Sequence, residues 1–322
     1  MRKSRMGLIS LWVIIVAVCS AVPFVFDPNT SYIVFFLFMC FIYVALSQSW
    51  NLIAGYTGQI TLGIHAFFGI GAYVVAIPWS RGLIGYLSPV GMVAAGCGAA
   101  IVAILIGIPL LSKLRGDYFA LGTLGLGEIL RLVTVQGRGF TGGPVGLMLP
   151  SSSFTSMVPH YFIALFIAAL AIAVTYYMTR SRIGLALVAV RDVEPAAAAS
   201  GINVLRIKVT VFAVGAFIMG LCGAVQANYI FHVEPQGFFS LNWTLYPVLM
   251  CIMGGAGRIA GPIIGALFLN AVFEIAKYFL PEIHPIFSGL LIILAIMFLP
   301  SGVAGIRIRR LVGIRKGTIK EG

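Results

Sequence analysis

Polar side chains interrupt an apolar stretch near the start of the chain. Residues 51–73 read NLIAGYTGQITLGIHAFFGIGAY and place amide, hydroxyl and imidazole groups where the neighbours are apolar. Inside a bilayer such groups are tolerated only where they face protein or a water-filled path. The pattern predicts either a tightly packed helix or a packed helix that also lines a translocation path. The candidate path residues are Asn51, Thr57, Gln59 and His65.

A pair of opposite charges lies in a second apolar stretch, residues 114–133, which reads LRGDYFALGTLGLGEILRLV. Glu128 and Arg131 are three residues apart, so they share one face of a helix. A lone charge in lipid costs several kcal/mol by insertion scales. We therefore expect the two side chains to pair near the outer interface. The pair is either structural or a second-rank part of the path.

Enzymatic chemistry and metal binding are not expected of this chain. The five cysteines lie in or beside apolar runs without CxxC spacing, which is typical of small buried hydrophobic residues. The four histidines are scattered along the sequence, and three of them fall at the outer ends of apolar runs. We therefore predict no catalytic residue and no metal ligand.

The composition is that of an integral membrane protein. Hydrophobic residues make up 60% of the 322 and charged residues 9%, against about 25% charged in soluble domains. We predict an all-α polytopic protein with one transmembrane domain, residues 1–322. Because a helix needs about 20 apolar residues to cross the hydrocarbon, we expect ten spans, of which the third, fifth and eighth are weakest: 8–26, 32–54, 59–79, 90–111, 117–136, 158–179, 208–231, 243–256, 259–280 and 285–300.

The basic residues orient these spans. With the N-terminus in the cytoplasm, 17 of the 21 Lys and Arg residues fall on the cytoplasmic side and 3 outside. This asymmetry is the positive-inside pattern, and it argues against a nucleic-acid ligand as the reason for the +12 charge. Residues 180–208 and a basic tail, residues 301–322, are then cytoplasmic, and the tail is expected to lie against anionic headgroups.

Residues 180–208 form the longest internal segment that a bilayer would reject. They read RSRIGLALVAVRDVEPAAAASGINVLRIK and carry five cations and two acids. We expect one helical piece over residues 183–190. A second should begin near Pro195, with Glu194 suited to a helix N-terminus and Gly201 to the position after its end. A helix of small residues can fit into the groove of a partner protein.

A second glycine-rich break, residues 253–266, reads MGGAGRIAGPIIGA. Two interrupted spans in one chain are a pointer to a binding path in transporters.

Five pieces between residues 51 and 266, in order, together resemble the LivM-type permease subunit of branched-chain amino acid ABC importers. They are NLIAGYTGQITLG with AFFGIGAY, LRGDYFALGTLGLGEILRLV, TGGPVGL, GLALVAVRDVEPAAAASGINVLRIK and GGAGRIAGPIIGA. The resemblance implies a complex in a bacterial or archaeal plasma membrane with a paralogous LivH-type permease, two ATP-binding subunits and an extracytoplasmic solute-binding protein. It also implies an ATPase-coupling region, with candidates Arg182, Gly184, Arg191, Asp192, Glu194, Ala197 and Gly201.

ATP chemistry is expected of the partner chains, because this sequence has no GxxxxGK[ST] phosphate loop. ATP and Mg²⁺ would be used by those subunits, and this chain would carry no cofactor. The predicted function is the permease subunit of an importer for branched-chain amino acids. Urea, short amides and aromatic acids remain alternative substrates, and an ATP-independent channel or secondary carrier is the alternative class.

Overall fold

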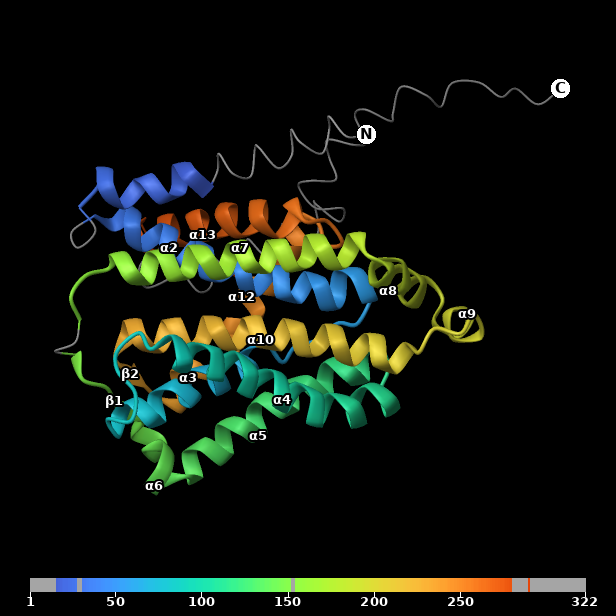
Figure 1. The fold of residues 1–322 in the computed structure, drawn as a ribbon, viewed down its shortest axis with the longest axis horizontal. Helices are drawn as coiled ribbons and strands as arrows, with labels where there is room; N and C mark the ends of the chain where they lie inside the picture. Colours follow the sequence, from blue (N-terminus) through green and yellow to red (C-terminus); the bar gives the residue numbers. More distant parts are fainter. Residues whose placement is uncertain (1–15, 28–30, 152–153, 280–288, 290–322) are drawn as a thin grey trace.

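The computed structural model describes residues 16–27, 31–151, 154–279 and 289. Within these ranges the chain is mostly helical, and the long helices form one bundle (Figure 1). A helical segment over residues 16–25 comes first. The later elements are α2 (Tyr32–Trp50), the π-helix η1 (Asn51–Gly55), α3 (Ile64–Ser80), α4 (Pro89–Lys113), α5 (Asp117–Gln136), α6 (Arg138–Thr141), the 3₁₀-helix η2 (Gly143–Val145), β1 (Leu147–Met148), α7 (Val158–Arg180), α8 (Arg182–Asp192), α9 (Glu194–Ala199), α10 (Val204–Ile230), β2 (His232–Val233), α11 (Pro235–Phe238), α12 (Asn242–Gly254) and α13 (Ala260–Phe279).

Polar side chains at element ends fix where two of the helices begin. Asn203 accepts a hydrogen bond from the amide of Arg206 over 3.0 Å at the start of α10. Ser181 accepts one from the amide of Ile183 over 3.1 Å at the start of α8. Each bond satisfies a backbone donor that has no partner within its own helix. The connection from α7 to α10 is therefore capped at the start of α8 and at the start of α10.

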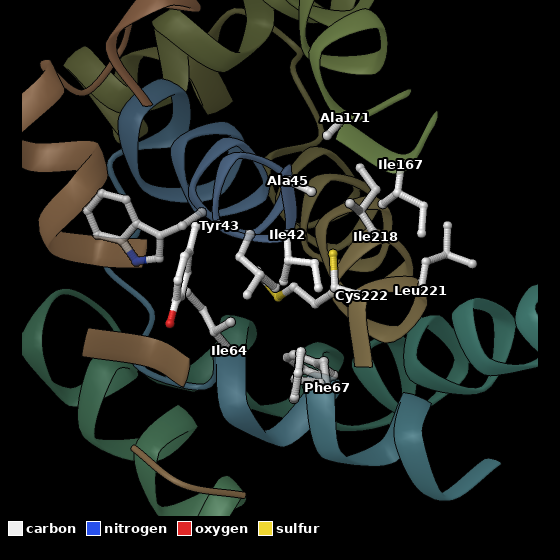
Figure 2. Close-up of a cluster of buried hydrophobic side chains, with 14 of the residues drawn as sticks. Ile42, Tyr43, Ala45, Ile64, Phe67, Ile167, Ala171, Ile218, Leu221 and Cys222 are labelled. Carbon is white, nitrogen blue, oxygen red and sulfur yellow. The ribbon is translucent and has the colours of Figure 1, made fainter. Parts of the chain in front are cut away.

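The core is built around α2 and α10, which pack against α3 and α7. Figure 2 shows side chains from these four helices meeting in one apolar cluster, among them Ile42, Phe67, Ile167 and Ile218. In α3 and α10 glycines let the backbones touch, because a side chain on Gly71 would overlap the carbonyl oxygen of Gly220. Close approach through small residues is how helices gain packing energy within a membrane.

Seven helices of the described residues are long and apolar enough to cross a membrane. They correspond to seven of the ten predicted spans, including the weak fifth and eighth. The third is different, since α3 has 17 residues and is preceded by non-helical chain from residue 58 to 63. The predicted span 285–300 and the tail 301–322 lie outside the described residues, as does the start of span 8–26. The count of ten therefore stays a prediction.

The two ends of the bundle differ in structure. At one end, which we call the β1–β2 end, β1 and β2 pair antiparallel with Leu147 opposite Val233. This ladder joins the segment after α5 to the segment after α10. At the other end, the α8–α9 end, α8 and α9 project beyond the long helices (Figure 1).

Candidate functional site

Between η1 and α3, residues 58–63 form a non-helical segment that side chains from neighbouring helices hold in place. Trp50 Nε1 donates to the carbonyl oxygen of Thr61 over 2.8 Å. The amide of Leu62 donates to Thr123 Oγ1 of α5 over 3.0 Å. Non-helical backbone at membrane depth requires such partners, because lipid supplies none. The first glycine-rich stretch is thus a broken helix whose break is fixed by α2 and α5.

The second break, between α12 and α13, lies directly against η1. Asn51 Nδ2 donates to the carbonyl of Arg258 over 3.0 Å, and the amide of Gly257 donates to Asn51 Oδ1 over 2.7 Å. One turn earlier, Gln48 Nε2 donates to the carbonyl of Ile259 over 3.0 Å. We call η1 together with residues 255–259 the glycine junction. Asn51, predicted to face a path, is fully buried and uses both ends of its amide to hold this junction.

Arg191, near the end of α8, reaches the glycine junction from the α8–α9 end. Its Nη1 donates to the carbonyl oxygen of Gly55 over 3.1 Å, and its Nε lies 3.4 Å from Asp192 Oδ1. The side chain runs between Gly58 and Gly257, where an added Cβ would come within 3.0 and 3.4 Å of it. One cation thus contacts both breaks. It connects them to α8, which the family resemblance assigns to the coupling region.

A pocket of about 160 Å³ opens beside this contact and combines the two predicted sets of residues. Thr57 and Gln59 of the candidate path line one side, and Arg191 and Glu194 of the candidate coupling region line another. The remaining lining residues are Gly58, Leu114, Arg115, Gly116, Phe119, Val190 and Lys208.

Cations dominate the charge of this pocket. Arg115, Arg191 and Lys208 face a single carboxylate, that of Glu194. Lys208 Nζ lies 2.8 Å from Glu194 Oε2, and the lysine side chain is only 5% exposed. The ion pair ties the start of α9 to α10. Arg115 has no ion-pair partner among the described residues, so the pocket keeps a net positive charge suited to an anionic group.

Thr57 and Gln59 differ in how their polar atoms are used. The hydroxyl of Thr57 donates to the carbonyl oxygen of Ile53 in the preceding turn, so it is already satisfied. Gln59 Oε1 is buried without a hydrogen-bond partner in the described structure. A buried acceptor left unpaired costs about 1–3 kcal/mol. Of the two, Gln59 has the free capacity to meet a passing solute or a water molecule.

His65 lies apart from the pocket, where α3, α5 and α12 meet. Its Nδ1 is 2.8 Å from Thr244 Oγ1, and its own amide donates to the same oxygen over 3.0 Å. Its Nε2 has no partner and faces Gly127, where a Cβ would overlap the ring nitrogen. The imidazole is therefore a buried link between three helices. The four predicted path residues do not converge on one cavity.

Glu128 and Arg131 form the ion pair that their spacing predicts, but Glu128 lies near the middle of α5 rather than near the outer interface as expected. Arg131 Nε and Nη2 both lie 2.9 Å from Glu128 Oε2. The carboxylate side chain is 39% exposed and the guanidinium side chain 31% exposed. The pair lies on the outer side of α5. The inner side of that helix meets His65 through Gly127.

The loop after α7 contains the two helical pieces expected from its sequence. α8 spans Arg182–Asp192 and α9 spans Glu194–Ala199, and Gly201 follows with a φ of +82°. Gly184 packs against the carbonyl of Thr179. Ala197 is buried, and Arg182 and Asp192 are exposed. The structure thus contains both pieces, with ends within two residues of those expected, whereas their contact with an ATPase stays a prediction.

Sequence reasoning missed several residues that build this region. Gln48 carried a usable signal, because it is a second amide in an apolar span three residues before Asn51. Arg115 and Lys208 were visible as cations at span ends. Thr123 and Thr244 gave no such signal, since each is an ordinary hydroxyl whose partner lies on a distant helix.

The chain matches known permeases over most of its length. The family model described as "Branched-chain amino acid transport system / permease component" covers residues 32–296. The LivM permease protein of the high-affinity branched-chain amino acid transport system of Escherichia coli K12 is 28% identical over 94% of this chain and 75% of its own. In Salmonella typhimurium the LivM protein is 28% identical over 82% of this chain and 68% of its own, and the LivH permease protein 27% over 85% and 82%. No solved structure matches the chain. The chain therefore belongs to the branched-chain amino acid transport system permease family.

Proposed function

We propose that this chain is the permease subunit of an ATP-driven importer for branched-chain amino acids. It works with a paralogous permease, two ATP-binding subunits and an extracytoplasmic binding protein. The α8–α9 end lies in the cytoplasm together with both termini, as the distribution of basic residues requires. The partner subunits use ATP and Mg²⁺, and this chain provides a path and a surface for the ATPases.

The observation that carries the proposal is the contact of Arg191 with Gly55. A subunit driven by ATPases needs a surface element that they can push and a membrane element that can rearrange. Here the surface helix α8 is hydrogen-bonded to the end of the π-helix, and π-helical turns occur frequently at functional sites. α8 therefore bears on the glycine junction without an intervening loop.

The residues proposed to line the path are those whose polar groups are not used in packing contacts. Gln59 faces the pocket beneath the glycine junction with an unpaired oxygen, and Thr57 lines the same wall. Arg115 gives the pocket a cation for the carboxylate of an amino acid leaving towards the cytoplasm. His65 lies in the wall formed by α3 and α5, whereas the pair Glu128–Arg131 lies on the outer side of α5. Asn51 supports the wall from behind.

The test is transport by the reconstituted complex. The chain is co-expressed with the paralogous permease and the ATPase subunits, placed in proteoliposomes with ATP inside, and supplied with the binding protein and radiolabelled leucine. We expect uptake that requires ATP and is lost when the ATPase lysine that contacts phosphate is replaced. Leucine, isoleucine and valine should compete for uptake.

Two other results would overturn parts of the proposal. Competition by urea, a short amide or an aromatic acid but not by leucine would assign a different substrate to the same importer architecture. Uptake by this chain alone, without ATP or partners, would make it a channel or secondary carrier. Only three described acids lie in the long helices away from α8 and α9, namely Asp117, Glu128 and Glu274. Glu128 is paired, and Glu274 contacts Lys277 and the hydroxyl of Tyr32, which leaves little for ion coupling.

A further inference from the structure

Three of the helices that could cross a membrane have the same low share of buried residues. In α4, α5 and α7 only 28% of the apolar stretch is buried, against 72% in the span α2–η1 and in α10. A helix surface that the fold leaves uncovered meets lipid, water or another protein. In Figure 1, α5 runs along the lower edge of the bundle and α7 along the opposite side.

The surfaces of α4 and α7 suit lipid. α4 carries no Asp, Glu, Lys or Arg before Lys113, and α7 carries none before Arg180, each at the very end of its helix. Both helices expose large apolar side chains, such as Leu105 in α4 and Phe166 in α7. Hydrocarbon solvates such side chains fully. Neither helix needs a protein partner.

The surface of α5 does not suit lipid. Glu128 lies eleven residues after Asp117, which is roughly 16 Å along a helix that rises 1.5 Å per residue. It therefore sits near the middle of the span, half-exposed together with Arg131. Arg131 uses two nitrogens on one carboxylate oxygen, so Glu128 Oε1 and Arg131 Nη1 make no hydrogen bond with the described residues. Hydrocarbon offers neither a donor nor an acceptor, and charged groups there are costly.

A glycine on the same helix leaves room for a neighbour. Among the glycines inside α3, α4, α5, α10, α12 and α13, only Gly125 has no atom of the described fold within 4 Å of an added Cβ. It lies between Leu121 and Ile129, four residues away on either side and both exposed. A small residue flanked by large ones lets a second helix approach closely.

We propose that this face of α5, made of Leu121, Gly125, Glu128, Ile129 and Arg131, is the surface that binds the second permease chain. The inference rests on the proposed function, which supplies such a chain. Salmonella typhimurium has both a LivM and a LivH permease protein, and each aligns with more than 80% of the length of this chain. The partner contributes a transmembrane helix with a small residue opposite Gly125 and polar atoms that bind Glu128 Oε1 and Arg131 Nη1.

The surface is tested by photo-cross-linking in the assembled transporter. The photoreactive residue benzoylphenylalanine replaces Leu121 or Ile129, which are 62% and 60% exposed, in the chain co-expressed with its paralogous permease and the ATPase subunits. Leu105 and Phe166, 67% and 66% exposed, are the matched controls on α4 and α7. We expect adducts with the paralogous permease from both α5 positions and from neither control. Adducts between two copies of this chain, or equal adducts from the controls, would overturn the assignment.

A second pair of variants separates contact from folding. Gly125→Leu fills the open position, and Ala94→Leu makes a similar change on the exposed face of α4. We expect Gly125→Leu to reduce recovery of the paralogous permease about tenfold, equivalent to ~1.4 kcal/mol of association. Ala94→Leu should not reduce it, and the isolated chains should melt alike. Recovery unchanged by Gly125→Leu would count against the surface.

The same preparations distinguish a failure of the α5 surface from a failure of the proposed function. If the unmodified complex takes up leucine with ATP while the α5 positions give no adduct, the α5 surface is wrong and the function stands. If no partner is recovered and no ATP-dependent uptake occurs with the unmodified chain, the proposed function fails, whatever the cross-linking gives.

Discussion

Arg191 donates a hydrogen bond to the carbonyl oxygen of Gly55 over 3.1 Å, although 136 residues separate the two in the sequence. The acceptor is the last carbonyl of the π-helix, at the end where the helix dipole is negative, so the guanidinium is favoured there. This contact joins α8 to the glycine junction. The first prediction follows from it.

Replacing Arg191 should uncouple transport from ATP hydrolysis. Arg191→Ala removes a charge-assisted hydrogen bond worth about 1.5–3 kcal/mol, so movement of α8 no longer reaches η1. We expect uptake to fall about tenfold or more while the complex assembles and still hydrolyses ATP. Arg206→Ala, which removes an exposed cation in the first turn of α10, is the control and should transport normally. Normal uptake by Arg191→Ala would refute the link.

Gly201 should be needed for docking of the ATPases. Gly201 has a φ of +82° and Gly82 a φ of +71°, and an added Cβ meets nothing at either position. Gly→Val therefore imposes a comparable left-handed strain, about 1–2 kcal/mol, at opposite ends of the bundle. We expect Gly201→Val, alone or with Glu194→Lys, to reduce co-purification of the ATPase subunits, and Gly82→Val to leave it intact. Equal recovery from both would remove the docking role.

Gln59→Leu should reduce uptake without harming the fold. Because Gln59 Oε1 is buried and unpaired, an apolar side chain of similar size removes a polar group that the described structure does not satisfy. Thermal stability should stay the same or rise, whereas uptake falls if the oxygen meets the solute. Gln136→Leu, at the exposed last residue of α5, serves as the control. Full uptake by Gln59→Leu would take Gln59 off the path.

Asn51→Ala should destabilise the chain. The change removes the two hydrogen bonds that the Asn51 amide makes across the glycine junction, and a buried group that loses its partner, such as the amide of Gly257, costs about 1–3 kcal/mol. We expect a clearly lower melting temperature in detergent. Ser47→Ala, one turn earlier, should be neutral because the Ser47 hydroxyl is buried without a partner. If both variants melt like the parent chain, Asn51 is not the tie that its contacts suggest.

Much of the fold could be read from the sequence because hydrophobic length determines where helices cross. The ends of α8 and α9 were also predictable, since Glu194 and Gly201 are local signals that act within one turn. The predicted start of the third span, residue 59, was too early, since α3 begins at Ile64. Residues 59–63 are apolar enough to be helical, but the bonds from Trp50 and Thr123 hold them in another conformation.

The arrangement of the site could be predicted only in part. Glu128 and Arg131 pair as expected because both lie on one helix. Asn51 was assigned to a path from its polarity alone, yet its amide is bound to the second break, more than 200 residues away. A polar group in an apolar span indicates that the group has a partner, but the sequence does not indicate which residue that is. The long-range pairs could therefore be identified only from the structure.

The π-helix at Asn51–Gly55 has a consequence for insertions and deletions. Its hydrogen bonds reach one residue further than those of an α-helix, so it holds one residue more than a regular ladder would. Deleting a single residue there restores ordinary α-helical bonding and should be absorbed locally. The helix on either side would keep its direction, but the carbonyl of Gly55 would no longer lie where Arg191 reaches it. The chain would then keep its fold and lose the contact between α8 and the glycine junction.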